Sequence, residues 1–233
     1  MPERADTAAS LQHLAQPKVL ARAAVAGLLT TLACLSALIT APSHPYPSSF
    51  EVPIFFCCVS LLWAFVFAWH FQYTTRPVFL APFKPKFWLE ASAYAVIVGV
   101  LEYRLLDPPL RQLMPGEFPS DTTSWLAMCA FQVLFVPLFT CLAPYAFFMR
   151  LLQRPAAAMS LTVLWGVVIA YARLSSVPTL PALTVTAMIF LTRVVGGFAA
   201  VYFYLNGSVW LIWWIALLLQ LRLWLEITVA RSG

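Results

Sequence analysis

The chain has 233 residues, of which 62% are hydrophobic and only 10% charged, and its formal net charge is +5. Long apolar runs follow one another along the chain, and a transmembrane α-helix needs roughly 20 apolar residues, so a soluble globular protein is excluded. A backbone in lipid must satisfy its own hydrogen bonds, so we expect an all-α, polytopic transmembrane helical bundle. The basic residues form no clustered face, which excludes a nucleic-acid partner.

The apolar runs define the expected organisation. Residues 1–19 form a polar tail, and residues 20–233 form a single transmembrane domain. The expected spans are about 20–41, 53–73, 87–105, 125–149, 157–174, 181–204 and 208–228. Seven is therefore the predicted number, although Pro137 and Pro144 remove backbone donors within the fourth run, and a break there would give eight.

The segments between these runs carry the turn-forming residues. Residues 42–51 and 106–124 are rich in Pro, Ser and Asp and are expected to connect spans outside the membrane. Asn206-Gly207-Ser208 predicts a tight turn between the last two spans.

The distribution of Lys and Arg predicts the orientation. The first run begins too deep in the chain for an ordinary signal peptide and should remain as an anchor. With a cytoplasmic N-terminus, the inner side holds Arg4, Lys18, Arg22, Arg76, Lys84, Lys86, Arg150 and Arg154, and the outer side holds Arg104, Arg111, Arg173 and Arg231. Because cytoplasmic loops are enriched in basic residues, we expect the N-terminus to be cytoplasmic. The chain has eleven Arg and three Lys, a bias that is typical of a GC-rich, bacterial genome. We therefore expect the protein in a bacterial inner membrane.

The cysteines and histidines give little support for a metal or a cofactor, and we expect neither. All five cysteines lie in expected spans, with no CxxC spacing and no histidine partner. His70 is the only histidine in an expected span and is a possible ligand for a haem, chlorophyll or metal. A single histidine cannot supply a bis-His haem, and packing beside Trp69 at the membrane interface is the simpler interpretation.

Acidic residues inside apolar runs are costly and are usually kept for a purpose. Glu90 and Glu102 lie near opposite ends of the third span, about 18 Å apart at about 1.5 Å per residue. They cannot form a paired-carboxylate site. We expect Glu102 to pair instead with Arg104 or Arg111.

Three blocks in the second half of the chain carry a resemblance to a known family. The first is Tyr145-Ala146-Phe147-Phe148-Met149-Arg150-Leu151-Leu152-Gln153, the second Trp165-Gly166-Val167-Val168-Ile169, and the third begins at Tyr204-Leu205-Asn206-Gly207-Ser208-Val209-Trp210 and runs through Ala216 to Gln220. In order and spacing they resemble the CAAX-protease and bacteriocin-processing (CPBP) family of intramembrane glutamic proteases. The CPBP-like core would cover about 125–228.

The family pattern is degenerate in this chain. Its first motif reads approximately EExxFRGxLQ, and here only Arg150 and the Leu152-Gln153 ending remain. The resemblance implies a water-activating glutamate together with histidine and asparagine donors for the oxyanion. The equivalent positions hold Tyr145, Ala146, Ile169, Ala216 and Gln220, which offer neither a general base nor the family's oxyanion donors. No catalytic residue is therefore assigned, and the resemblance implies a pseudoprotease.

The leading hypothesis is a non-catalytic binding, scaffolding or assembly factor for a membrane-protein partner or a lipid or isoprenoid ligand. Arg150, Arg193 and Arg222 would be the polar points of its cavity, and the small pair Gly196-Gly197 would let a partner helix approach closely. The main alternative is an intramembrane enzyme that protonates an isoprenoid or lipid through Glu90, Glu102 or Glu226, as in an acid-initiated cyclase or transferase. A transporter is the third choice.

Overall fold

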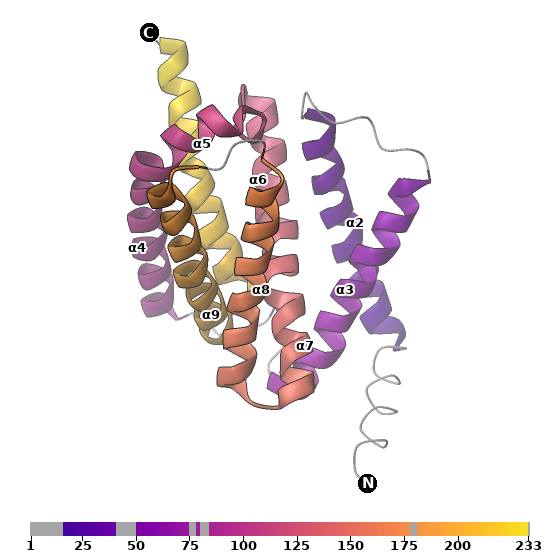
Figure 1. The fold of residues 1–233 in the computed structure, drawn as a ribbon. Helices are drawn as coiled ribbons and strands as arrows, with labels where there is room; N and C mark the ends of the chain where they lie inside the picture. The colour runs from indigo at the N-terminus through magenta and orange to yellow at the C-terminus, as the bar shows by residue number, and fades with distance from the viewer. Residues whose placement is uncertain (1–15, 41–49, 75–77, 80–83, 178–180, 233) are drawn as a thin grey trace.

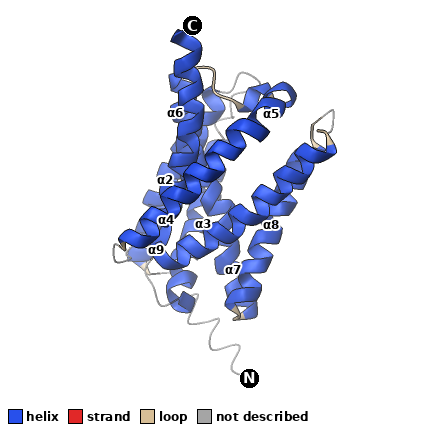
Figure 2. Ribbon diagram, turned by 90° about the vertical axis from the view of Figure 1, so that its left-hand side faces the viewer, coloured by secondary structure: helices blue, strands red, loops and turns tan. Residues whose placement is uncertain are grey.

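The computed structural model describes residues 16–40, 50–74, 78–79, 84–177 and 181–232, and within them every regular element is helical. In chain order the elements are α2 (Pro17–Thr40), α3 (Glu51–Thr74), α4 (Pro85–Leu101), the π-helical turn η1 (Glu102–Leu106), α5 (Asp107–Leu113), the 3-10 turn η2 (Pro115–Glu117), α6 (Thr122–Pro137), the π-helical turn η3 (Leu138–Leu142), α7 (Ala143–Leu152), α8 (Pro155–Ser175) and α9 (Leu183–Ser232). The long helices run roughly along one common direction (Figures 1 and 2). The all-α prediction is confirmed for the described residues.

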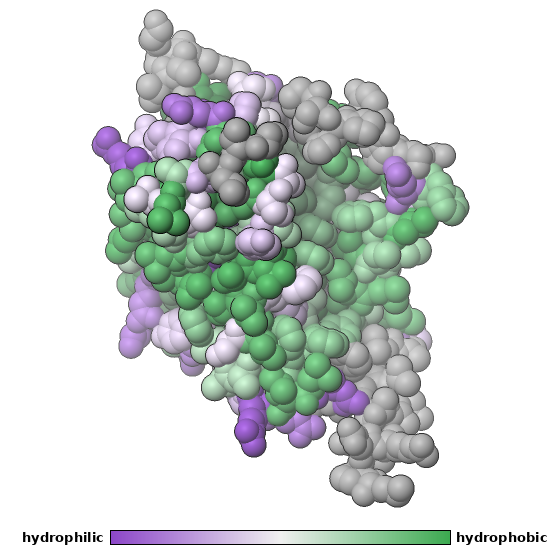
Figure 3. All heavy atoms as spheres, viewed as in Figure 1, coloured by the Kyte–Doolittle hydropathy of each residue, from purple (hydrophilic) through white to green (hydrophobic). Residues whose placement is uncertain are grey.

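Five helical segments of the described chain are long and apolar enough to cross a membrane. They are Pro17–Thr40, Glu51–Ala68, Thr122–Leu152, Pro155–Ser175 and Leu183–Leu225. On the face seen in Figure 3, apolar residues form a broad middle zone and polar residues gather toward the two ends. This distribution is compatible with an integral membrane protein.

The number of candidate spans differs from the predicted seven or eight for two reasons. The third expected span corresponds to α4, which is 17 residues long and ends where the π-helical turn begins. The last two expected spans belong to one 50-residue helical element, α9, which contains a non-helical residue at Ser208 (φ 67°, ψ −175°). The predicted interruption at Asn206-Gly207-Ser208 is therefore present.

The two limbs of α9, residues 183–207 and 209–232, run along α4 in opposite directions. On the first limb, the Tyr202 ring lies 6.2 Å from the ring of Phe87, near the start of α4. On the second limb, Trp214 Nε1 donates to Ser92 Oγ at 2.9 Å, and Arg222 reaches Glu102 beyond the end of α4. The limbs consequently form a hairpin, and the second one rises to the end of the molecule marked C in Figure 1.

Proline explains both π-helical turns. In η1 the chain continues into Asp107-Pro108, and in η3 it continues into Ala143-Pro144. A proline inside a helix lacks an N–H and its ring collides with the carbonyl four residues earlier. The residue before each proline instead donates to the carbonyl five residues back, from Asp107 to Glu102 and from Ala143 to Leu138.

The expected extra break in the fourth run does not occur, because this wider turn accommodates the proline. The run stays helical from Thr122 to Leu152. Asp121 begins it with a capping box: its carboxylate accepts from the N–H groups of Thr123 and Ser124, and the Ser124 hydroxyl accepts from the N–H of Asp121.

The helices pack in neighbouring pairs: α2 against α3 and α6, α3 against α7, α4 and α6 against α9, and α8 against α7 and α9. Helices α2 and α3 approach closely at Gly27, where an added Cβ would lie 2.9 Å from Ser60 Cα. Trp63 Nε1 of α3 also donates to Thr30 Oγ1 of α2 at 3.0 Å. A small residue and a buried hydrogen bond thus hold this pair together, as is usual for helices in lipid.

For the site described below, the end of the molecule that contains α5 is called the upper end, and the end that contains the α7–α8 connection is called the lower end (Figure 1). Gln153 makes that connection with a left-handed backbone (φ 51°), and Pro155 begins α8. Arg150 and Arg154 flank it, so both lie at the lower end.

Candidate functional site

Three charged residues meet near the upper end of the bundle. Arg222 Nη1 lies 2.6 Å from Glu102 Oε2, and its Nε and Nη2 lie 2.9 Å and 3.3 Å from the two carboxylate oxygens of Asp107. The Asp107 side chain is only 3% exposed, and those of Glu102 and Arg222 are 21% and 18% exposed. We call Glu102, Asp107 and Arg222 the ionic cluster. The guanidinium holds Asp107 with two donors, the geometry of the strongest charge-assisted pairs.

The π-helical turn positions both carboxylates of the ionic cluster. Glu102 and Asp107 are five residues apart, and the backbone N–H of Asp107 donates to the carbonyl of Glu102 across the wider π-helical turn. Arg222 approaches from the second limb of α9, where its Nη1 also donates to the carbonyl of Leu219 at 2.9 Å. Turns of this kind occur frequently at functional sites.

The predicted partners of Glu102 were wrong. Arg104 lies 5.8 Å from the ring of Tyr103, and Arg111 lies 4.6 Å from the ring of Phe118. The residue that pairs with Glu102 is Arg222, 120 positions further along the chain. Asp107 was not predicted as a site residue. Its position beside Pro108 at the end of an apolar run was the available signal, because a proline there widens the preceding turn.

Two further arginines lie near the ionic cluster. Arg173, at the end of α8, forms a two-donor ion pair with Glu117, and both side chains are partly exposed. Arg193, on the first limb of α9, is close enough to Glu102, Glu117, Arg173 and Arg222 to interact with them electrostatically. The upper end therefore gathers charges from four separate parts of the chain.

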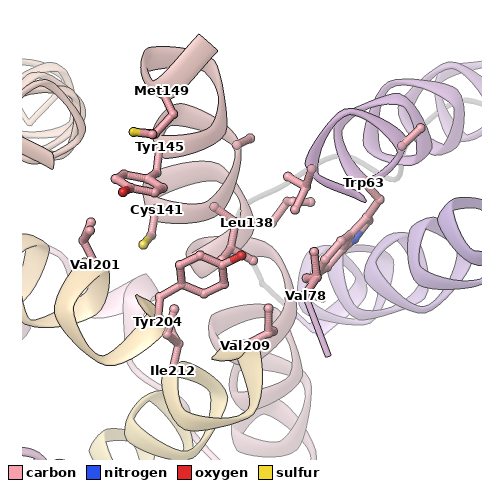
Figure 4. Close-up of a cluster of buried hydrophobic side chains, with 14 of the residues drawn as sticks. Trp63, Val78, Leu138, Cys141, Tyr145, Met149, Val201, Tyr204, Val209 and Ile212 are labelled. Carbon is pink, nitrogen blue, oxygen red and sulfur yellow. The ribbon is translucent and has the colours of Figure 1, made fainter. Parts of the chain in front are cut away.

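The first and third sequence blocks come together in an apolar core (Figure 4). The Tyr145 ring lies 6.4 Å from the ring of Tyr204 at 68°, an edge-to-face contact, and Tyr145 is 1% exposed. Cys141, one turn before Tyr145, and Ile212 belong to the same cluster. Ala146 is 2% exposed. Tyr145 and Ala146 are thus both packed in the interior of the protein.

The other motif positions lie elsewhere. Ile169 and Ala216 are half-buried, and neither belongs to the core cluster that contains Tyr145. Gln220 is 8% exposed, and its backbone carbonyl accepts from Trp125 Nε1 at 2.9 Å. The structure brings together two of the three blocks, with the middle one outside that cluster.

The remaining predicted site residues are dispersed. Glu90 forms an i,i+4 pair with Lys86 at 3.8 Å on the surface of α4. Arg150 is half-buried in the last turn of α7. His70 and Glu226 lie within α3 and α9, but their side chains are outside the described residues. In the described part of the chain no three His, Cys, Asp or Glu side chains gather to hold a metal ion.

Gly196 and Gly197, where the sequence predicts the close approach of a partner helix, face helices of the chain itself. A Cβ on Gly196 would lie 3.6 Å from the Tyr94 hydroxyl oxygen, and one on Gly197 would lie 3.1 Å from Val163 Cγ2. Gly197 permits a close approach of α8, whereas a methyl group at Gly196 would make only an ordinary contact with Tyr94 of α4, so both positions face helices of the bundle.

Comparisons with known proteins found no match to any family model, curated protein or solved structure.

Proposed function

We propose that this chain is a non-catalytic, CPBP-like membrane protein that binds a membrane partner or an apolar ligand as a scaffold or assembly factor. The proposal is supported by the fact that the acidic side chains of the ionic cluster and side chains at motif positions already have partners within the protein. Glu102 and Asp107 are already held by Arg222, and Tyr145 and Ala146 are packed in an apolar core. Peptide hydrolysis needs a general base with free access to water, and these groups supply none.

The CPBP-like part of the proposal is supported by the meeting of the first and third blocks. Tyr145 and Tyr204 are 59 positions apart in the sequence, yet their rings are in contact. A family whose motifs form one site requires this convergence, and the spacing of Arg150 and the Leu152-Gln153 ending resembles that of the family's first motif.

The ionic cluster also bears on the alternative of an acid-initiated enzyme. Such an enzyme needs a carboxylic acid that is protonated and faces its substrate. Glu102 forms an ion pair with Arg222, whose Nη1 lies 2.6 Å from Glu102 Oε2, and Glu90 pairs with Lys86 at the surface. Both carboxylates are thus already occupied by basic side chains of the same chain, so we favour binding over acid catalysis.

Arg150 gives the experiment that tests the binding function. We expect wild-type protein, purified from native membranes in mild detergent, to retain an integral membrane protein or lipid. Arg150→Ala should weaken its recovery and lower the melting temperature, because removing a half-buried guanidinium leaves its partners unsatisfied at about 1–3 kcal/mol. Arg154→Ala, at an exposed position four residues further, is the matched control and should change neither. If wild-type protein, Arg150→Ala and Arg154→Ala recover the partner equally and melt at the same temperature, Arg150 does not support the proposed function.

We further propose seven crossings, with α4 and the two limbs of α9 each crossing once, in a bacterial inner membrane with a cytoplasmic N-terminus. The opposite directions of the α9 limbs and their alignment with α4 support this number. Described basic residues at the lower end support the orientation: Lys18, Arg22, Lys84, Lys86, Arg150 and Arg154.

Cysteine labelling tests this orientation. In a variant without the five native cysteines, single cysteines replace Ser10, which precedes α2 in the sequence, and Ser120 at the upper end. An impermeant maleimide added to intact cells should label the cysteine at position 120 and leave position 10 unlabelled. The reverse pattern would invert the topology, and labelling at both positions would contradict an odd number of crossings between them.

A further inference from the structure

Arg193 lies on a face of α9 that is flanked by other helices. It precedes Gly196 and Gly197 by one helical turn, and residues three and four apart share a helix face. A Cβ added to Gly196 would lie 3.6 Å from the Tyr94 hydroxyl of α4, and one added to Gly197 would lie 3.1 Å from Val163 Cγ2 of α8, so these helices are the neighbours of this face. Arg193 therefore lies between α4 and α8, and its side chain, which tilts toward the start of its helix, extends toward the upper end.

The opposite face of this limb is the one that faces outward. Leu191 and Val195, each two residues from Arg193 and so about 200° around the helix, are 62% and 46% exposed. Arg193 is itself an exposed residue, although protein atoms surround it closely. The Arg193 side chain therefore lies on the face of this limb that is directed toward α4 and α8, and part of it remains accessible.

The guanidinium donors of Arg193 are unused within the part of the chain that the structure describes. The neighbouring arginines are occupied, Arg222 by Glu102 and Asp107, and Arg173 by Glu117. Among the described residues, Arg193 itself makes no direct hydrogen bond or ion pair. Five guanidinium N–H groups without a protein acceptor require water or a ligand.

The charges around Arg193 indicate which ligand fits. The ionic cluster contains two carboxylates and one guanidinium, a net charge of −1, and Arg193 balances it at longer range. A simple anion would disturb this balance, whereas a zwitterion would keep it. Glu102 follows the 17 residues of α4, roughly 25 Å along its axis. In a core of about 30 Å this position is close to the upper headgroup region.

We propose that Arg193 and Glu102 flank a binding site for the headgroup of a zwitterionic aminophospholipid. The Arg193 guanidinium binds the phosphate through its planar fork, and the partly exposed Glu102 carboxylate faces the ammonium. This proposal rests on the proposed function, whose ligand it specifies. The two proposals can fail separately, because the lipid site is tested by lipid affinity of the isolated protein, whereas the binding function is tested by recovery of a partner from native membranes.

The test measures lipid affinity of the delipidated, full-length protein in nonionic detergent by native mass spectrometry. The probes are phosphatidylethanolamine, phosphatidylglycerol and inorganic phosphate. Wild-type protein should bind phosphatidylethanolamine more tightly than phosphatidylglycerol. Arg193→Gln should weaken the former by about tenfold or more, the loss expected for a charge-assisted bond. Arg193→Lys, which keeps the charge without the fork, should fall between, and Arg154→Gln at the lower end should match wild type.

Each other outcome overturns the proposal. Equal phosphatidylethanolamine affinity in wild-type protein and Arg193→Gln would exclude Arg193 from the site. Equal or tighter binding of phosphatidylglycerol would contradict the charge balance, and displacement of lipid by inorganic phosphate would assign a free-anion site instead. Arg193→Gln should not lower the melting temperature of the lipid-free protein, because it removes no protein contact. Failure of this variant and of Arg193→Lys to fold would show that Arg193 is structural.

Discussion

Replacing Arg222 with Gln should destabilise the protein more than any other single charge removal considered above. The change leaves Asp107, whose side chain is 3% exposed, and Glu102 as neighbouring carboxylates without their guanidinium. Removing one partner of a buried ion pair costs about 3–5 kcal/mol, because the remaining charge is neither solvated nor compensated. We expect a large fall in the melting temperature of the protein in detergent, and tryptophan fluorescence measures this temperature.

Arg173→Gln is the matched control for this prediction. Arg173 also holds a carboxylate with two donors at the upper end, but its side chain is 45% exposed and that of Glu117 is 37% exposed. An exposed pair of this kind contributes about 0–1 kcal/mol. Combining Arg222→Gln with Glu102→Gln and Asp107→Asn should restore part of the lost stability, since no buried charge then remains. If Arg222→Gln melts no lower than Arg173→Gln, the ionic cluster does not stabilise the fold.

The helices were predictable because hydropathy is a local property of the chain. The expected spans 20–41, 53–73 and 157–174 correspond within a few residues to Pro17–Thr40, Glu51–Thr74 and Pro155–Ser175. The response to proline was not predicted, since a run of residues does not show whether the helix breaks or widens. At Pro144 it widens into η3 and continues.

The ionic cluster was not predictable from spacing, because Asp107 and Arg222 are 115 positions apart. A weaker signal was present. Glu102 and Arg222 each lie near the end of an apolar run, and charges at the same depth of a helical bundle must find partners. Because successive spans cross the membrane in opposite directions, the ends of the third and seventh expected spans lie on the same side, which would have placed Glu102 and Arg222 at the same end. The inward face of Arg193 likewise depends on which helices flank Gly196 and Gly197, which only the fold determines.

We propose that the chain binds a membrane partner or ligand and does not cleave peptides. The most direct measurement incubates the purified protein with prenylated CAAX-type and leader-type peptides and quantifies new termini by mass spectrometry. Each missing oxyanion donor costs on the order of 100 to 1000-fold in rate, and the general base is absent as well, so turnover should equal that of a detergent blank. Cleavage above the blank that Arg150→Ala abolishes would contradict the claim.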